Sequence, residues 1–114
     1  MKDVSLILYT VADMDKAKQF FRELNGVDPY VDQPYYVGFK CANIEIGLTP
    51  ATPKSQAGGV AYWRVDDIAA TIKGLVAAGG TVGQEPTDVG GGMQVASVKE
   101  PNGTVIGLRQ FPKG

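Results

Sequence analysis

The chain has 114 residues, with 11 basic and 12 acidic side chains and a formal net charge of −1. This length fits one domain of ordinary size, and the balanced charge offers no basic surface for nucleic acid or an anionic membrane. The sequence has no histidine and a single cysteine, Cys41. The commonest metal ligand is therefore missing, and an internal disulfide is excluded.

The sequence predicts a cytoplasmic protein. No run of about 18 apolar residues occurs, and Met1-Lys2-Asp3 leads into a strand pattern without the apolar segment of a signal peptide. One cysteine without a partner agrees with a reducing compartment. We expect no membrane partner and no nucleic-acid partner.

The N-terminal segment predicts a buried strand followed by a helix. Val4 to Val11 is almost continuously apolar, which is typical of a strand buried on both faces. Asp13 is a good N-cap, and Asn25-Gly26 supplies the glycine that ends a helix. Residues on the expected inner face of this helix recur at helical spacing: Met14, Ala17, Phe20, Phe21 and Leu24. Val27 to Pro34, with two prolines, predicts a loop or an irregular edge strand.

Two strands and a linker are expected next. Segments 35–40 and 43–48 predict a hairpin about Cys41-Ala42. Alternation in the second strand places Ile44, Ile46 and Leu48 on one face and Glu45, with Asn43, on the other. Segment 49–58 contains two prolines and few apolar residues, which predicts an exposed linker.

The second half of the chain repeats the first at an offset of 54 residues (67 − 13), because Asp67 then falls on Asp13 and Trp63 on Tyr9. Segment 59–65 predicts a strand with Trp63 on its helix side, and Asp67 caps a helix that ends at Gly79-Gly80. Further elements follow in order: an edge strand at 81–88, a glycine-rich tip at 90–92, and a hairpin of 93–98 and 104–110 about Glu100-Pro101-Asn102-Gly103.

These motifs resemble the vicinal oxygen chelate superfamily, the glyoxalase, bleomycin-resistance and extradiol-dioxygenase group. The resemblance is carried by Val11-Ala12-Asp13-Met14, Val65-Asp66-Asp67-Ile68 and the Glu100 turn leading into Ile106-Gly107-Leu108. It implies an α+β fold of two βαβββ modules that form a curved mixed sheet, with helices on the convex side and a ligand cavity on the concave side. We expect a single domain over 1–114, with module one at about 1–50, a linker at about 49–58 and module two at about 59–114. The resemblance also implies a homodimer.

The resemblance implies four positions for a divalent metal, one in the first strand and one in the last strand of each module. The matching residues here are Leu6, Glu45, Val60 and Gly107. Only Glu45 can ligate a metal, whereas a site needs roughly three or more protein ligands. We therefore expect neither a metal nor another cofactor.

Alternation along the strands predicts which residues line the cavity. The predicted lining is Leu6, Leu8, Thr10, Asn43, Glu45, Val60, Tyr62, Arg64, Val105 and Arg109, with Tyr35 or Tyr36 nearby. Among these we predict ligand-binding roles for Thr10, Tyr36, Glu45, Tyr62, Arg64 and Arg109. Other interpretations stay open, since Glu45 could be solvated or paired with Arg64, the arginines could lie at the rim, and the tyrosines could be core residues.

Two functions remain open at this point. The first is a metal-free protein of the glyoxalase/bleomycin-resistance type that binds a small organic molecule and sequesters an antibiotic or metabolite. The alternative is a metal-independent isomerase or lyase, with Glu45 as general base and Arg64 or a tyrosine hydroxyl stabilising developing negative charge.

Overall fold

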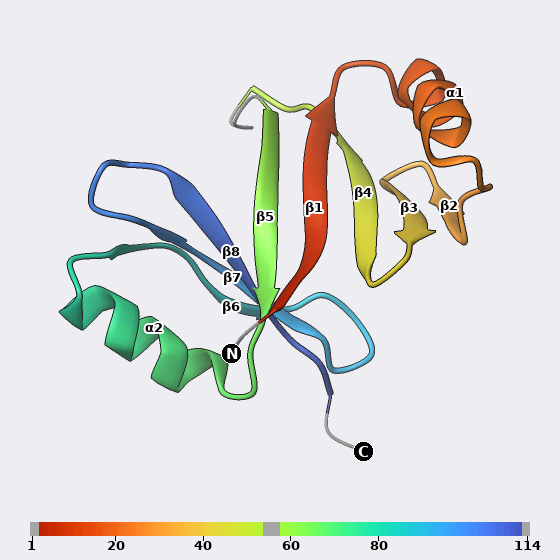
Figure 1. Cartoon of the computed structure of the whole chain (residues 1–114). Coiled ribbons are helices and arrows are strands. Elements are labelled where there is room, and N and C mark those ends of the chain that lie inside the picture. The colour runs from red at the N-terminus through yellow and green to blue at the C-terminus, as the bar shows by residue number, and fades with distance from the viewer. Residues whose placement is uncertain (1–2, 54–57, 113–114) are drawn as a thin grey trace. The chain divides into compact units, whose positions relative to one another are not determined.

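A computed structural model of the chain describes residues 3–53 and 58–112. Contacts divide these residues into two compact units, one formed by Ser5–Val60 and the other by residues 61–112 with Asp3 and Val4. Along the chain, the elements follow the order strand, helix and three strands, twice (Figure 1). The predicted α+β class and the two βαβββ modules are confirmed. Neither helix in the described part of the chain has the length and apolar character that crossing a membrane requires.

Module one forms a mixed sheet in the order β2-β3-β4-β1. β1 runs parallel to β4, whereas β3 is antiparallel to both of its neighbours. The elements are β1 (Asp3–Val11), α1 (Met14–Asn25), β2 (Val31–Gln33), β3 (Tyr36–Cys41) and β4 (Ile44–Pro50).

Helix α1 begins and ends where the sequence predicted. The Asp13 side chain accepts a hydrogen bond from the backbone N–H of Lys16 at 3.0 Å, which satisfies one of the free amide groups at the helix start. At the other end Gly26 adopts a φ of 73° and its N–H donates to the Arg22 carbonyl. A residue with a side chain would be strained in that conformation.

The core of module one lies between α1 and the strands β3 and β4. Its fully buried residues are Val37, Phe39 and Leu48, and the partly buried residues packed on them are Tyr9, Val11, Met14, Ala17, Phe21, Cys41 and Ile46. This confirms the predicted faces of β4, since Ile46 and Leu48 lie on the helix side and Glu45 on the other. The expectation that Phe20 and Leu24 also face the core is wrong, because they are 64% and 67% exposed. Met14, Ala17 and Phe21 already form one face of α1, and Phe20 lies about 100° further around the helix from Phe21.

The hairpin between β3 and β4 differs from the prediction by a few residues. Ala42 has a φ of 57° and, with Asn43, forms the turn, so Asn43 is not part of the strand as expected. β4 instead continues to Pro50, where it pairs with Val11 of β1. The predicted linker therefore starts after Pro50, and its residues 54–57 lie outside the described part of the chain.

Module two repeats this arrangement in the order β5-β8-β7-β6, with β5 parallel to β8. The Asp67 side chain caps α2 by accepting from the N–H of Ala70 at 3.0 Å. Packing of α2 against its sheet buries Val65, Ile68, Ile72, Ala96, Val98 and Leu108, with Trp63, Leu75 and Val82 partly buried around them. Trp63 thus lies on the helix side, as predicted. The elements are β5 (Gly58–Arg64), α2 (Ile68–Ala77), β6 (Thr81–Asp88), β7 (Gln94–Lys99) and β8 (Val105–Gln110).

The turn between β7 and β8 is held by the Glu100 side chain. Its Oε1 accepts hydrogen bonds from the backbone N–H groups of Asn102 at 2.8 Å and Thr104 at 3.0 Å. These bonds, the one from Thr104 first, lower the pKa of Glu100 from its ordinary value because they favour the charged carboxylate. The Glu100 carboxylate therefore holds the backbone of this turn in place.

Candidate functional site

The predicted ligand-binding residues fall into two groups, one in each compact unit. Thr10, Tyr36 and Glu45 lie in module one, and Tyr62, Arg64 and Arg109 lie in module two.

In module one, Glu45 is bound by two tyrosine hydroxyls. The Tyr30 hydroxyl donates to Oε1 at 2.6 Å, and the Tyr36 hydroxyl donates to Oε2. Lys40, the register partner of Glu45 on β3, places its Nζ 4.7 Å from the centre of the Tyr30 ring. We call Tyr30, Tyr36 and Glu45 the Tyr–Glu–Tyr cluster. Its hydrogen bonds to a charged acceptor are of the strong kind.

Two glycines make room for this cluster. Gly38 and Gly47 are register partners on β3 and β4. A Cβ at Gly47 would lie 2.5 Å from the Tyr36 hydroxyl oxygen, and one at Gly38 would lie 2.9 Å from Oε2 of Glu45. A side chain at either position would displace the phenol ring that now lies over the two strands.

Two other predicted residues of module one lie apart from Glu45. Thr10 is half-buried near the end of β1, where it pairs with Thr49 rather than with Glu45. Tyr35 precedes β3 and is 70% exposed. Of the two tyrosines proposed for the cavity, Tyr36 is therefore the one that reaches Glu45.

In module two, all three predicted residues share one face of the sheet. Tyr62 is the register partner of Gly107, and Arg64 is the register partner of Arg109, on the parallel strands β5 and β8. The Tyr62 ring lies so close to Gly107 that a Cβ there would be 2.4 Å from Cδ2 of the ring. Burial raises the pKa of the Tyr62 hydroxyl above its usual value, and the charge of Arg109 opposes part of this rise. Tyr62 is therefore a neutral hydrogen-bond donor at physiological pH.

Phe111, just after β8, joins the two arginines. The guanidinium carbons of Arg64 and Arg109 lie 4.0 Å and 4.8 Å from the centre of its ring. Arg64 is exposed, whereas Arg109 is only 8% exposed. We call Arg64, Phe111 and Arg109 the Arg–Phe–Arg cluster. It concentrates two positive charges on one aromatic ring.

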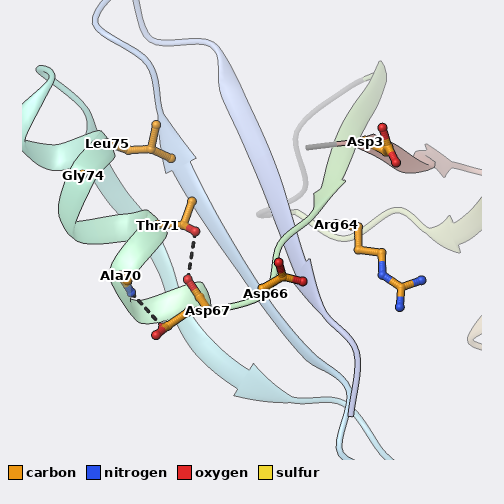
Figure 2. A pocket seen from close by; sticks show the side chains of 8 residues that line it. All are labelled: Asp3, Arg64, Asp66, Asp67, Ala70, Thr71, Gly74 and Leu75. Carbon is orange, nitrogen blue, oxygen red and sulfur yellow. Dashed lines mark hydrogen bonds between the residues drawn. The ribbon is translucent and has the colours of Figure 1, made fainter. Parts of the chain in front are cut away.

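A pocket of about 790 Å³ opens beside α2 (Figure 2), lined by Asp3, Arg64, Asp66, Asp67, Ala70, Thr71, Gly74 and Leu75. Arg64 alone belongs to the lining predicted from alternation. Of the three aspartates that line this pocket, Asp67 has a structural role. Its side chain caps α2 by accepting a hydrogen bond from the N–H of Ala70, and its backbone carbonyl accepts one from the Thr71 hydroxyl. Figure 2 shows the Arg64 guanidinium pointing away from Asp66 and Asp67.

The residues do not fit a divalent metal. Glu45 has the hydrocarbon side chain of Leu6 as its register partner on β1, and the Gly107 position is covered by Tyr62. Within residues 3–53 and 58–112, no group of three or more Cys, Asp or Glu side chains is arranged to hold a metal ion.

Sequence reasoning missed Tyr30 and Phe111. Tyr30 was hidden in a segment that predicted a loop, and Phe111 follows the last strand. The repeated Ile-Gly-Leu at 46–48 and 106–108 is a signal for neither residue, but it does mark the glycines under Tyr36 and Tyr62. The two glycines occupy equivalent places in the two modules. Gly47 pairs with Leu8 and Gly107 pairs with Tyr62, and these partners are separated by the repeat offset of 54 residues (62 − 8). Each repeated glycine marks a place where a tyrosine ring lies over the sheet.

Comparison with known proteins gives the fold and the family. A search of curated proteins finds no match to the sequence. Among solved structures, a hypothetical protein from Bacillus halodurans aligns with a TM-score of 0.80 at 15% identity, over 99% of this chain and 96% of that one. Methylmalonyl-CoA epimerase from Mycobacterium tuberculosis aligns with a TM-score of 0.72 at 17% identity, over 96% and 88% of the two chains.

The Mn(II)-bound glyoxalase from Novosphingobium aromaticivorans is also similar, with a TM-score of 0.71 at 20% identity, over 96% of this chain and 40% of that one. At these identities the likeness shows the fold alone. The sequence profile of the Glyoxalase/Bleomycin resistance protein/Dioxygenase superfamily, however, matches residues 4–108. The chain belongs to this superfamily.

Proposed function

We propose that the protein binds a small organic molecule without the help of a divalent metal, and so sequesters an antibiotic or a metabolite. One observation carries the proposal: Tyr62 occupies the space over Gly107, one of the four positions at which the resemblance implies a metal ligand. Leu6 and Val60 occupy two more of these positions and have no donor atoms.

The remaining position, Glu45, also supports the proposal. Its two carboxylate oxygens each accept a hydrogen bond from a tyrosine, so the side chain is held by partners within its own module. A single carboxylate in this setting is a polar anchor for a ligand rather than part of a metal site, which needs several ligands.

Similar structures do not decide the question by their fold. The name of one neighbour describes a Mn(II)-bound glyoxalase, and that of another describes an epimerase. The fold alone therefore does not identify the function, which depends on the side chains at the site. Those side chains favour binding through tyrosines, arginines and one carboxylate.

A thermal-shift screen of small organic molecules, each with and without a chelator, tests the proposal. A compound that binds only the folded protein stabilises it by about 2.7 kcal/mol at one hundred times its Kd. We expect hits whose stabilisation the chelator leaves unchanged, and elemental analysis showing no stoichiometric metal in the purified protein. One zinc, nickel, iron or manganese ion per chain, with a melting temperature that falls when it is removed, would overturn the proposal.

A second candidate is a metal-independent isomerase or lyase with Glu45 as general base. The Tyr–Glu–Tyr cluster favours it, because two hydroxyls fix the carboxylate while its oxygens keep further acceptor capacity. The two candidates differ in what happens to a bound compound. Recovery of the screening hits unchanged after prolonged incubation supports binding, whereas conversion that Glu45→Gln abolishes supports the enzyme.

A further inference from the structure

We propose that the ligand carries an oxyanion group, such as a carboxylate, and that Arg64 and Arg109 bind this group beside Phe111. The proposal rests on the small-molecule binding proposed above and adds the chemical class of the ligand. It comes from the Arg–Phe–Arg cluster, which lies wholly within module two.

The sheet register brings the two guanidinium groups together. Partners on parallel strands point to the same face, so Arg64 and Arg109 emerge side by side at the end of β5 and β8. Both groups lie over the Phe111 ring, at 4.0 Å and 4.8 Å from its centre. The ring attracts each cation through its negative face, which favours this placement of both guanidinium groups. An anion bound beside the ring would interact favourably with both positive charges at once.

Arg64 is available for such an anion. It is exposed, and neither of the two salt bridges found in the described part of the chain involves it. Its closest acidic neighbours in sequence are Asp66 and Asp67, but the guanidinium points away from both (Figure 2). Arg109 is buried, and a guanidinium has five N–H donors, so it can serve a ligand as well as partners within the chain. Two planar guanidiniums suit the paired oxygens of a carboxylate.

The surroundings indicate what the rest of the ligand is. Tyr62 lies two residues before Arg64 on the same face and presents an aromatic ring with a neutral hydroxyl. Phe111 supplies a second aromatic ring, which both guanidinium groups contact. A small aromatic or apolar body with one anionic group matches this combination.

Backbone amide NMR titrations with naphthoate, and with its uncharged analogue naphthamide, test the inference. We expect naphthoate to shift the signals of residues 62–64 and 107–111 saturably, and naphthamide to bind at least about tenfold more weakly, the scale of a lost hydrogen bond to a charged group. Inorganic phosphate that competes with naphthoate at the same signals would support an anion site. Equal affinity for the two naphthalene compounds would overturn it, as would naphthoate binding elsewhere or not at all at millimolar concentration.

Variants of Arg64, with a matched control, test whether this side chain binds the anionic group. Arg64→Met should weaken naphthoate binding by about tenfold or more, and Arg64→Lys by less, because it keeps the charge but not the planar fork. Lys73→Met removes one positive charge from an exposed position of α2 and should leave the affinity unchanged. An affinity in Arg64→Met equal to that of the natural protein would sink the inference. A different result would contradict the proposed function itself: no compound of any charge would stabilise the protein in the thermal-shift screen.

Discussion

The Tyr62 ring lies directly over the backbone of Gly107, its register partner on the neighbouring strand, with three ring carbons between 2.4 and 2.6 Å from the place where a Cβ would be. Real Cβ atoms essentially never approach other atoms this closely. Gly107 is therefore required by the tyrosine that covers it, and the same two residues exclude a ligating side chain from this position. One contact therefore contributes both to the packing of the sheet and to the argument against a metal at this position.

Replacing this glycine tests the contact. Gly107→Ala should lower the free energy of unfolding by about 1–3 kcal/mol, the usual cost of overpacking, because the Tyr62 ring must move. Urea denaturation measures the change. In a Tyr62→Ala background, by contrast, Gly107→Ala should change the free energy of unfolding very little, because the ring that collides with the new Cβ is gone. Equal costs of Gly107→Ala in the two backgrounds would show that the contact does not govern this position.

Gly74 provides the matched control. It lies within α2, and a Cβ there would meet no atom within 4 Å. Gly74→Ala should therefore raise the free energy of unfolding by roughly 1 kcal/mol through helix propensity. The same glycine-to-alanine change is thus expected to have opposite signs at positions 74 and 107.

The sequence predicted the fold well because the signals for it are local. Asp13 and Asp67 each cap a helix after an apolar strand, and the repeat of this unit identified both modules. Faces of the strands followed from alternation, as Trp63 shows. Phe20 was misplaced because periodicity gives the direction of a side chain, whereas burial depends on how wide a face the sheet covers.

The candidate site was predictable only in part. Alternation gives the face of each strand residue without knowledge of the residues it contacts, and it identified Glu45, Arg64 and Arg109 as candidates. Tyr30 and Phe111 lie outside the regular strands, where no period applies, and their contacts join residues brought together by the sheet. Loop residues of this kind can be placed only once the register is known.

The Glu100 turn predicts a specific response to acid. Its pKa is lowered in the folded protein, chiefly by the backbone hydrogen bond from Thr104. A group of this kind stabilises the fold above its unfolded pKa and loses that contribution as pH falls through its folded pKa. Below pH 4.5, the ordinary value for this carboxyl, the free energy of unfolding should therefore fall more steeply in the natural protein than in Glu100→Gln. Urea denaturation over a pH series measures both slopes, and parallel curves would contradict the assignment.

Association into a homodimer is expected from the exposed surface. Phe20 and Leu24 on α1 are 64% and 67% exposed, and β2 and β6 each end the strand order of their own module. Apolar surface and open strand edges favour association, most often as a two-fold dimer. Sedimentation equilibrium should give twice the chain mass of 12.1 kDa. A single monomeric species at micromolar concentration would rule the dimer out without affecting the fold.

The Tyr–Glu–Tyr cluster gives the last prediction. Tyr36→Phe keeps the ring over Gly47 but removes the hydroxyl that donates to Glu45. Because the acceptor is charged and partly buried, we expect the free energy of unfolding to fall by about 1–2 kcal/mol. Tyr35→Phe is the control, since this tyrosine is 70% exposed and its change should stay within about 0.5 kcal/mol.

A double-mutant cycle with Glu45→Gln separates this contact from other effects of each change. Residues joined by a hydrogen bond show an interaction energy of about 0.5–3 kcal/mol, whereas independent sites add. Measured by urea denaturation, the double variant should therefore lose less stability than the sum of the two single variants. Strict additivity would mean that the Tyr36 hydroxyl does not hold the carboxylate, and Glu45 would then be positioned by the Tyr30 hydroxyl without help from Tyr36.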